Sequence, residues 1–499
     1  LMKKIIFVII LLTFCFYNNV SSKPQKGGTL RFGHLGDFQY FNPYKLPLAD
    51  WPMFNQLFNV LIRYDNNLNS QPELAKSWKF SEDKISLTLN LREDVYFHNG
   101  RKFNADDVVF SLEYVQKKES GANIRTLALS VESTEILNES KIKINFKNPT
   151  PAAFDLLDLL FIVNKETIDT IDSNPIGTGP FRFVEWSPGD YAKFKRFERY
   201  WKKDLPYLEN IIVKAIPSSG TMVSNLEAGS LHVIAAPPPS EYNRLSSLNE
   251  LKTYKGFPGG LVWNISLNLE RKPFNNKKVR HAMQYALDRK RIVETVFFNL
   301  SEPWIQPQSD KSILYDSKLE GRFYFDLNKA KNLLEETGTS GFEFTVMTAT
   351  TKPEGSKLLE VYQADLSKIG IKLNIENVEP AQYRPRARKR DFDAAVFTYG
   401  RASKDPSSLF GTTGVWRAKP WNVSNYYTEK YSNLILSGQH ETNLAKRSQI
   451  YKKLNKFQLE ESFIIVITPI IRWWAMSENI EGFNSNLDSM PILEKVYIK

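Results

Sequence analysis

One short segment of the sequence brings together side chains that could hold a charged solute. From position 399 to 406 it consists of Tyr399, Gly400, Arg401, Ala402, Ser403, Lys404, Asp405 and Pro406. A guanidinium can bind a carboxylate or a phosphate through two parallel hydrogen bonds, so Arg401, with Lys404 nearby, suits an anionic group. Aromatic side chains wall many solute sites, and Tyr399, Trp416 and Trp421 could supply them here. The segment therefore predicts a site that binds a solute with an anionic group.

The patterns of common catalytic and metal sites are missing from the sequence. The five histidines are scattered, and none stands in an HExxH pattern. There is no GxSxG motif, and the single cysteine, Cys15, can form neither a metal-binding cluster nor an internal disulfide. An exported hydrolase with a carboxylate pair is the one enzymatic alternative left open. We expect no enzyme, no cofactor and no bare metal ion.

The segment 399–406 follows a predicted strand of an α/β region. The strand covers 392–399, and before it come a strand at 342–348, a helix at 356–369 and a strand at 371–375. This order is a βαβ unit, which implies a parallel sheet with a right-handed crossover. An almost continuous apolar stretch near the end of the chain, 463–471, predicts one more, buried strand.

The first third of the chain predicts antiparallel strands instead. Apolar and polar residues alternate at 85–91. Asn104, with Asp107 three positions later, predicts the capped start of a helix. Strands at 131–136 and 142–146, joined by a turn, predict a hairpin. With 499 residues, the chain also exceeds what one hydrophobic core usually serves, so two or more lobes are expected.

The N-terminus has the pattern of a secretory signal peptide. Two lysines precede an apolar run at 5–17, which is too short at about 1.5 Å per residue to cross a bilayer core of ~30 Å. Small residues at 20–22 predict cleavage before Lys23, with a single membrane anchor as the alternative. Phe14 is bulky where a lipoprotein signal needs a small residue, so we do not expect a lipid on Cys15. The mature protein is expected to be free in the periplasm.

Six blocks in order along the chain carry a family resemblance. They are KGGTLRFG from Lys26, PELAKSW from Pro72, LNLREDVYFHNGRKFNADDVVFSLE from Leu89, GTGPFRF from Gly177, RFERYWKKDLPYLE from Arg196 and PFNNKKVRHAMQYALDRKRIVE from Pro273. One block alone would be a weak signal. The ordered set resembles the peptide/nickel class of extracellular solute-binding proteins of ABC transporters, which includes oligopeptide- and dipeptide-binding proteins. The resemblance runs from about Lys26 to the C-terminus.

The resemblance implies an α/β fold, a two-lobed clamshell of the type II periplasmic-binding-protein class with an additional subdomain on its first lobe. The implied parts are a signal peptide (1–22), a first lobe (23–50, 177–268 and 470–499), the additional subdomain (51–176) and a second lobe (269–469). The two crossings of the chain would act as hinges, and solute would bind where the lobes close.

The implied function is that of a receptor. It would capture a peptide or peptide-like small organic solute and deliver it to the transmembrane permease subunits of an ABC importer. We expect a monomer that binds no nucleic acid. A receptor of the same fold for a non-peptide anionic solute or a metal chelate is the main alternative. A non-transport interaction protein on this fold is another.

The family pattern also assigns site residues. Peptide-binding members usually place an aromatic residue, then an acidic residue three positions on that holds the peptide amine, then an acidic-Pro step. Tyr399 and Asp405-Pro406 match, but the amine-binding position is Ala402, which puts capture of a free amine in doubt and favours an anionic group beside Arg401. The expected second-lobe wall comprises Tyr399, Gly400, Arg401, Asp405, Trp416 and Trp421. Phe38, Gln39 and Tyr40 would face it, with Trp263 near the hinge. Ordinary packing is the alternative for the tryptophans.

Three further groups are interpreted as structural. The five basic residues at 384–390 are expected on a solvated helix face, which could also face anionic headgroups of the inner membrane. Arg280, Asp288 and Arg289 are expected to form a salt-bridged surface of one helix. His98 is expected in a tight turn rather than in a catalytic site.

Overall fold

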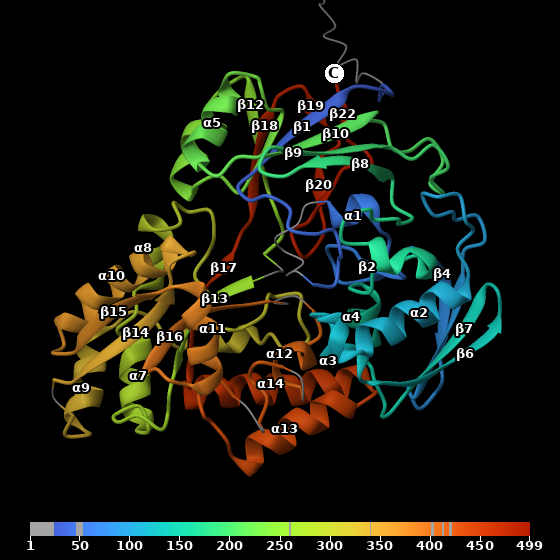
Figure 1. Cartoon of the computed structure of the whole chain (residues 1–499). Coiled ribbons are helices and arrows are strands. Elements are labelled where there is room, and N and C mark those ends of the chain that lie inside the picture. The colour runs from blue at the N-terminus through green and yellow to red at the C-terminus, as the bar shows by residue number, and fades with distance from the viewer. Residues whose placement is uncertain are drawn as a thin grey trace, which may run out of the picture.

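Three β-sheets organise the molecule, as Figure 1 shows. The computed structural model describes residues 24–45, 53–258, 261–339, 341–400, 404–411, 414–418 and 422–499. The predicted signal peptide therefore lies outside the described residues. No helix of the described ranges is long and apolar enough to cross a membrane.

The first large sheet has seven strands and mixes distant parts of the chain. In spatial order they are β12 (Leu251–Lys255), β18 (Trp473–Ser477), β11 (Val233–Ala235), β1 (Thr29–His34), β10 (Asn210–Ala215), β9 (Tyr191–Arg196) and β8 (Phe181–Ser187). β1 runs parallel to β10 and β11, and the other pairs are antiparallel. The helices of this part are α5 (Ser219–Glu227) and α6 (Tyr242–Ser246).

A four-stranded antiparallel sheet forms a separate layer, seen on the right of Figure 1. Its strands are β4 (Ala75–Phe80), β5 (Ser86–Leu91), β7 (Lys141–Phe146) and β6 (Val131–Asn138). Nearby lie α1 (Phe54–Leu57), α2 (Ala105–Gln116), α3 (Arg125–Ala128), α4 (Ala153–Leu157) and the small pair β2 (Ile62–Tyr64) with β3 (Ser70–Pro72). The predicted hairpin and capped helix are confirmed: β6 pairs with β7, and Asn104 N donates to the Asp107 carboxylate at 3.1 Å.

The second large sheet has five strands in the order β15 (Lys372–Val378), β14 (Glu343–Ala349), β16 (Ala394–Gly400), β13 (Leu261–Leu267) and β17 (Ile464–Ile470). β14 is parallel to β15 and β16, so the predicted βαβ unit is confirmed, with α10 (Pro353–Ser367) as its crossover. β17 is buried along almost its whole length, as its continuous apolar sequence predicts.

Helices cover both faces of this sheet. One core joins it to α7 (Lys277–Tyr285), α8 (Arg289–Thr295), α9 (Leu327–Glu335) and α10. The other core joins it to α11 (Pro380–Lys389), α12 (Ser407–Phe410), α13 (Glu429–His440) and α14 (Leu444–Glu461). Because side chains alternate along a strand, each strand contributes to both cores. The result is a rigid three-layer platform.

The chain passes between the two large sheets twice, and the two passages lie side by side. β12 pairs with β18 on one side, and β13 pairs with β17 on the other. The described parts of these passages are 256–258 and 471–472, and Gly256 N donates to Arg472 O at 2.8 Å between them. Below, "first lobe" means 24–258 with 471–499, and "second lobe" means 261–470.

These passages differ from the boundary expected at 268. β13 lies before that position, yet it pairs with β16 and β17 of the second sheet. The C-terminal segment returns to the first lobe, where β19 (Ile480–Glu481) pairs with β22 (Tyr497–Ile498) and β20 (Asn484–Ser485) with β21 (Pro491–Ile492). The division of the chain into functional lobes and a subdomain stays a prediction.

His98 connects the turn in which it lies to the segment directly before β8. Gly100 N donates to Phe97 O at 2.8 Å, which confirms the turn. The ring accepts from Gly177 N at Nδ1, at 3.3 Å, and lies 3.0 Å from Gly179 O at Nε2, so a neutral ring with its proton on Nε2 satisfies both contacts. Burial lowers the pKa of His98 to about 4.

We expect the protein to lose stability as the pH falls from about 6.5 to about 4, partly through His98. Its pKa in the folded state lies below the unfolded value of 6.5, so the unfolded state takes the proton first as the solution is acidified. The difference is worth at most about 3 kcal/mol. Urea unfolding at several pH values should show a flatter profile for His98→Gln than for the wild type and His440→Gln. Equal profiles for all three would contradict this.

Candidate ligand site between the two lobes

The carboxyl ends of three parallel strands lie at one edge of the second lobe. β14, β15 and β16 run in the same direction and end at Ala349, Val378 and Gly400. In open α/β sheets, ligands bind in the crevice outside the carboxyl ends of the strands. The segment 399–406 begins at the end of β16, so this edge is the candidate site.

Tyr399 stands at the end of β16 in an aromatic cluster. Its ring is parallel to that of Phe397, with 5.2 Å between centroids, and perpendicular to that of Trp416 at 5.7 Å. Burial raises the pKa of the Tyr399 phenol. Trp416 is 0% exposed and packs against Phe410 at 5.4 Å. In this structure Trp416 supports Tyr399 from the core, which is the packing role that the sequence left open.

Trp263 and Lys352 lie close together at the same edge. Trp263, on β13, is 4% exposed and packs against Phe297 at 6.0 Å. Lys352 Nζ lies 5.9 Å from the centroid of the Trp263 ring and donates to Thr398 Oγ1. A half-buried ammonium in this place suits the carboxylate of a solute. Sequence reasoning missed Lys352, although its position directly before Pro353, after a predicted strand, was a usable signal.

Asp405 is held inside the second lobe by Arg447. Arg447 donates from both terminal nitrogens to the two carboxylate oxygens, and its Nη2 lies 2.7 Å from Oδ1. Ser407 donates to Oδ1 from its backbone N at 3.0 Å and from its hydroxyl at 2.7 Å. Burial opposes the charge, but Arg447 and Ser407 outweigh it and lower the pKa of Asp405. Asp405 thus orders the loop, and a direct contact with solute stays a prediction.

Lys404 reaches across to the first lobe. Its Nζ lies 2.5 Å from Asp158 Oδ2 and 2.9 Å from Asp488 Oδ2, and its side chain is 0% exposed. Asp158 directly follows α4, and Asp488 lies in the turn between β20 and β21. Beside it, Asp405 N donates to Asp155 Oδ2 at 3.1 Å. The loop after β16 therefore contacts the first lobe directly, so a solute at this edge would lie near both lobes.

The expected first-lobe residues follow β1. Phe38 is 5% exposed and stacks on Phe41 at 4.8 Å, so it belongs to the first-lobe core. Gln39 is exposed, and Tyr40 is half-buried, with Lys45 Nζ 5.4 Å from its ring centroid. Gln39 and Tyr40 are the accessible side chains of this stretch.

Arg401 and Trp421, together with Ala402, lie outside the described residues. Gly400 ends β16 opposite Leu261 of β13. At the end of β16 the structure brings Tyr399 and Trp416 into contact and pairs Gly400 with β13. Trp263, opposite Thr398, packs on the other face of the sheet, and Asp405 lies in the loop that follows. Contact of these residues with solute stays a prediction.

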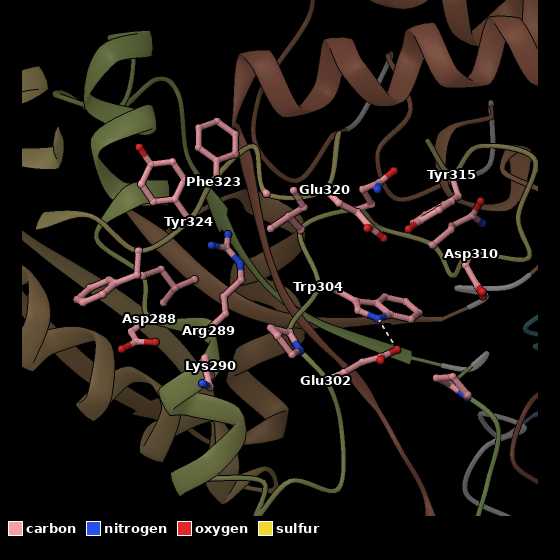
Figure 2. A pocket seen from close by; sticks show the side chains of 18 residues that line it. Asp288, Arg289, Lys290, Glu302, Trp304, Asp310, Tyr315, Glu320, Phe323 and Tyr324 are labelled. Carbon is pink, nitrogen blue, oxygen red and sulfur yellow. Dashed lines mark hydrogen bonds between the residues drawn. The ribbon is translucent and has the colours of Figure 1, made fainter. Parts of the chain in front are cut away.

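A cavity of about 670 Å³ lies elsewhere on the second lobe, beside Pro258 (Figure 2). Its walls are aromatic and charged, and they include Trp304, Tyr324 and Arg289. Trp304 Nε1 donates to Glu302 Oε1 at 3.0 Å, as the dashed line in Figure 2 marks. None of the predicted site residues that the structure describes lines it. It adjoins the loop after β16, because Gln308 of its wall donates from Nε2 to Lys404 O at 3.1 Å.

The prediction of a salt-bridged surface at Arg280, Asp288 and Arg289 on one helix is wrong in its location, although Arg280 does pair with Glu461 at 3.3 Å. Two helices replace the single one, because α7 ends before Asp288, which caps α8. Arg280 and Arg289 are only 3% and 5% exposed. Arg289 donates to Val466 O at 2.8 Å and to Gln284, and burial lowers its pKa to about 10. Carbonyl and amide oxygens satisfy this guanidinium, which joins two helices to β17.

The basic residues at 384–390 lie on and just after α11. Arg384, Arg388 and Lys389 are exposed, and Arg386 pairs with Glu376. The expected solvated helix face is confirmed.

Comparison with known proteins identifies the class. The chain matches "Bacterial extracellular solute-binding proteins, family 5 Middle" over residues 69–419, and it belongs to this family. Heme-binding protein A from Haemophilus influenzae is 27% identical over 467 residues, which cover 86% of this chain and 84% of that protein. Oligopeptide-binding protein AppA from Bacillus subtilis is 29% identical over 495 residues, covering 93% and 90%.

Comparison with solved structures supports the same family. The solved structure of Bacillus subtilis AppA in complex with a nonapeptide has a TM-score of 0.80 and 26% identity, and the match covers 96% of this chain and 100% of that one. The chain thus has the two-lobed α/β fold of type II periplasmic binding proteins. The relatives are solute-binding receptors rather than enzymes.

We expect Arg447→Met to lower the free energy of unfolding by about 3–5 kcal/mol, because it leaves the buried Asp405 carboxylate without its counter-ion. Arg386→Met is the matched control. Its pair with Glu376 is partly exposed and should be worth less than about 1 kcal/mol. Urea unfolding of both variants provides the comparison, and equally small losses would contradict the role assigned to Arg447.

Proposed function

We propose that this chain is the periplasmic receptor of an ABC importer, and that it captures a peptide or peptide-like solute between its lobes for delivery to a membrane permease. Membership of the extracellular solute-binding family supports the receptor role. The likeness to AppA, which was solved in complex with a nonapeptide, extends over nearly the whole of both chains and supports the peptide ligand. The periplasmic location rests on the family and on the leader predicted from the sequence.

The observation that carries the proposal is the edge at the end of β14 and β16. Lys352 supplies a cation there, the half-buried Tyr399 supplies aromatic surface, and the loop after β16 contacts the first lobe. A few fixed polar groups beside aromatic walls are what a solute site needs. Lys352 would hold the carboxylate of the solute.

The charges of the same loop favour binding over catalysis. Asp405 is paired with Arg447, and Asp158 and Asp488 are paired with Lys404. A general acid or base needs a carboxyl group that is available to exchange a proton with substrate. These carboxylates are instead committed to internal ion pairs. This pairing supports a role of the loop in binding rather than in catalysis.

We expect Lys352→Met to weaken binding of trialanine by about 10- to 30-fold, the loss of one charge-assisted hydrogen bond of about 1.5–2 kcal/mol. Wild-type protein should prefer trialanine to trialanine amide by a similar factor, and the variant should not distinguish them. Lys357→Met, on the exposed side of α10, is the matched control and should change affinity less than about twofold. Isothermal titration calorimetry of the wild type and both variants measures these affinities.

Native mass spectrometry of the purified protein tests the solute class itself. Recovery of co-purified peptides is the expected result. A single non-peptide acid, with no heat on adding trialanine, would overturn the peptide proposal. If the wild-type protein bound trialanine and trialanine amide with equal affinity, Lys352 would not belong to the site. The assignment of a peptide ligand would be unaffected.

A further inference from the structure

The ammonium of Lys404 is enclosed by carboxylates that belong to the opposite lobe. Asp158 and Asp488 lie 2.5 Å and 2.9 Å from Nζ, and they come from two segments of the first lobe that are distant in sequence. Tyr64 N donates to the other oxygen of Asp158 at 3.3 Å. Lys404 is 0% exposed at its side chain, so the second lobe carries a buried cation whose ion-pair partners among the described residues belong to the first lobe.

These ion pairs have no equivalent elsewhere in the described parts of the chain. Among the ion pairs that join two described residues, only those of Lys404 link the second lobe to the first. The surroundings are not a packed apolar interface. A cavity of about 270 Å³ lies between the two lobes, lined by residues of α3, of α4 and of the segments beside them on one side and by Ser407, Gln439 and His440 on the other.

A buried ion pair of this kind is suited to a contact that forms and breaks. The Coulomb attraction between the ions is only partly offset by their loss of hydration when the geometry is good, so the intact cluster holds the lobes with a modest net free energy. Removing one partner is different, because it leaves an unpaired charge that is stable only when water can reach it. Without the cation, Asp158 and Asp488 would also repel each other. Separation of the lobes relieves both penalties.

We propose that Lys404 is the closing ion of the receptor: its ammonium, with Asp158 and Asp488, holds the lobes together and sets the balance between open and closed states. The proposal rests on the proposed function, since it assumes that solute is captured by closure. Its readout needs no solute, however, so it can fail or succeed independently of the peptide assignment. In this role Lys404 is a positioning residue and need not touch the solute.

The test compares solute-stripped wild type with Lys404→Met by small-angle X-ray scattering and hydrogen exchange. We expect Lys404→Met to increase the radius of gyration. We also expect it to speed exchange about tenfold in three segments at once, 155–158, 404–411 and 484–492, because opening exposes both lobes. Lys404→Arg should stay close to the wild type. Lys372→Met, which breaks an exposed pair with Glu343 inside the second lobe, is the matched control.

A triple variant keeps the test decisive if Lys404→Met does not fold. Lys404→Met with Asp158→Asn and Asp488→Asn removes the three charges of these two ion pairs together, so that none of the three is left without its partner. The proposal expects this variant to be folded and more open than the wild type. An unchanged radius of gyration, with faster exchange confined to 404–411, would show that Lys404 only orders its own loop and would overturn the proposal.

Discussion

The structure depends on two short passages of chain that run side by side between its large sheets. β12 and β18 pair on one side of the passages, and β13 and β17 pair on the other, so each passage joins two paired strands. Their antiparallel pairing makes the connection two strands wide. The Gly256–Arg472 hydrogen bond joins the passages at the centre. A connection this narrow permits bending about one line, which is how a hinge lets two lobes close around a ligand.

The second lobe supplies a rigid surface for that movement. Helices on both faces bury its five-stranded sheet, and the carboxyl ends of β14 and β16 bring Lys352, Tyr399 and the loop after Gly400 to one edge. Two ion clusters then shape that loop. The pair of Asp405 and Arg447 anchors it to its own lobe, and Lys404 links it to the other. The Asp405–Arg447 pair orders the loop, and the ion pairs of Lys404 form a polar contact between the lobes.

Much of this fold could be predicted from local sequence patterns, because secondary structure depends on the spacing of neighbouring apolar and polar residues. Alternation gave the hairpin of β6 and β7, and the order strand, helix, strand gave the parallel sheet. The cluster at Lys404 could not be found in that way, since its partners lie 246 and 84 residues distant in sequence. The sequence pattern wrongly placed Arg289 on the surface, because a helix rich in polar residues is usually exposed. In the folded chain Arg289 is buried and donates hydrogen bonds to oxygens of the interior. The segment 399–406 was located correctly at the end of a strand, but whether its residues contact solute depends on the ligand.

The central claim is that solute binds at the edge of β14 and β16 and is enclosed by both lobes. A crystal structure of the protein with its co-purified solute tests it most directly. The claim predicts solute density beside Lys352 and Tyr399, with contacts to residues of the first lobe. Density confined to the cavity beside Pro258 and Trp304, with the edge at Lys352 empty, would contradict it.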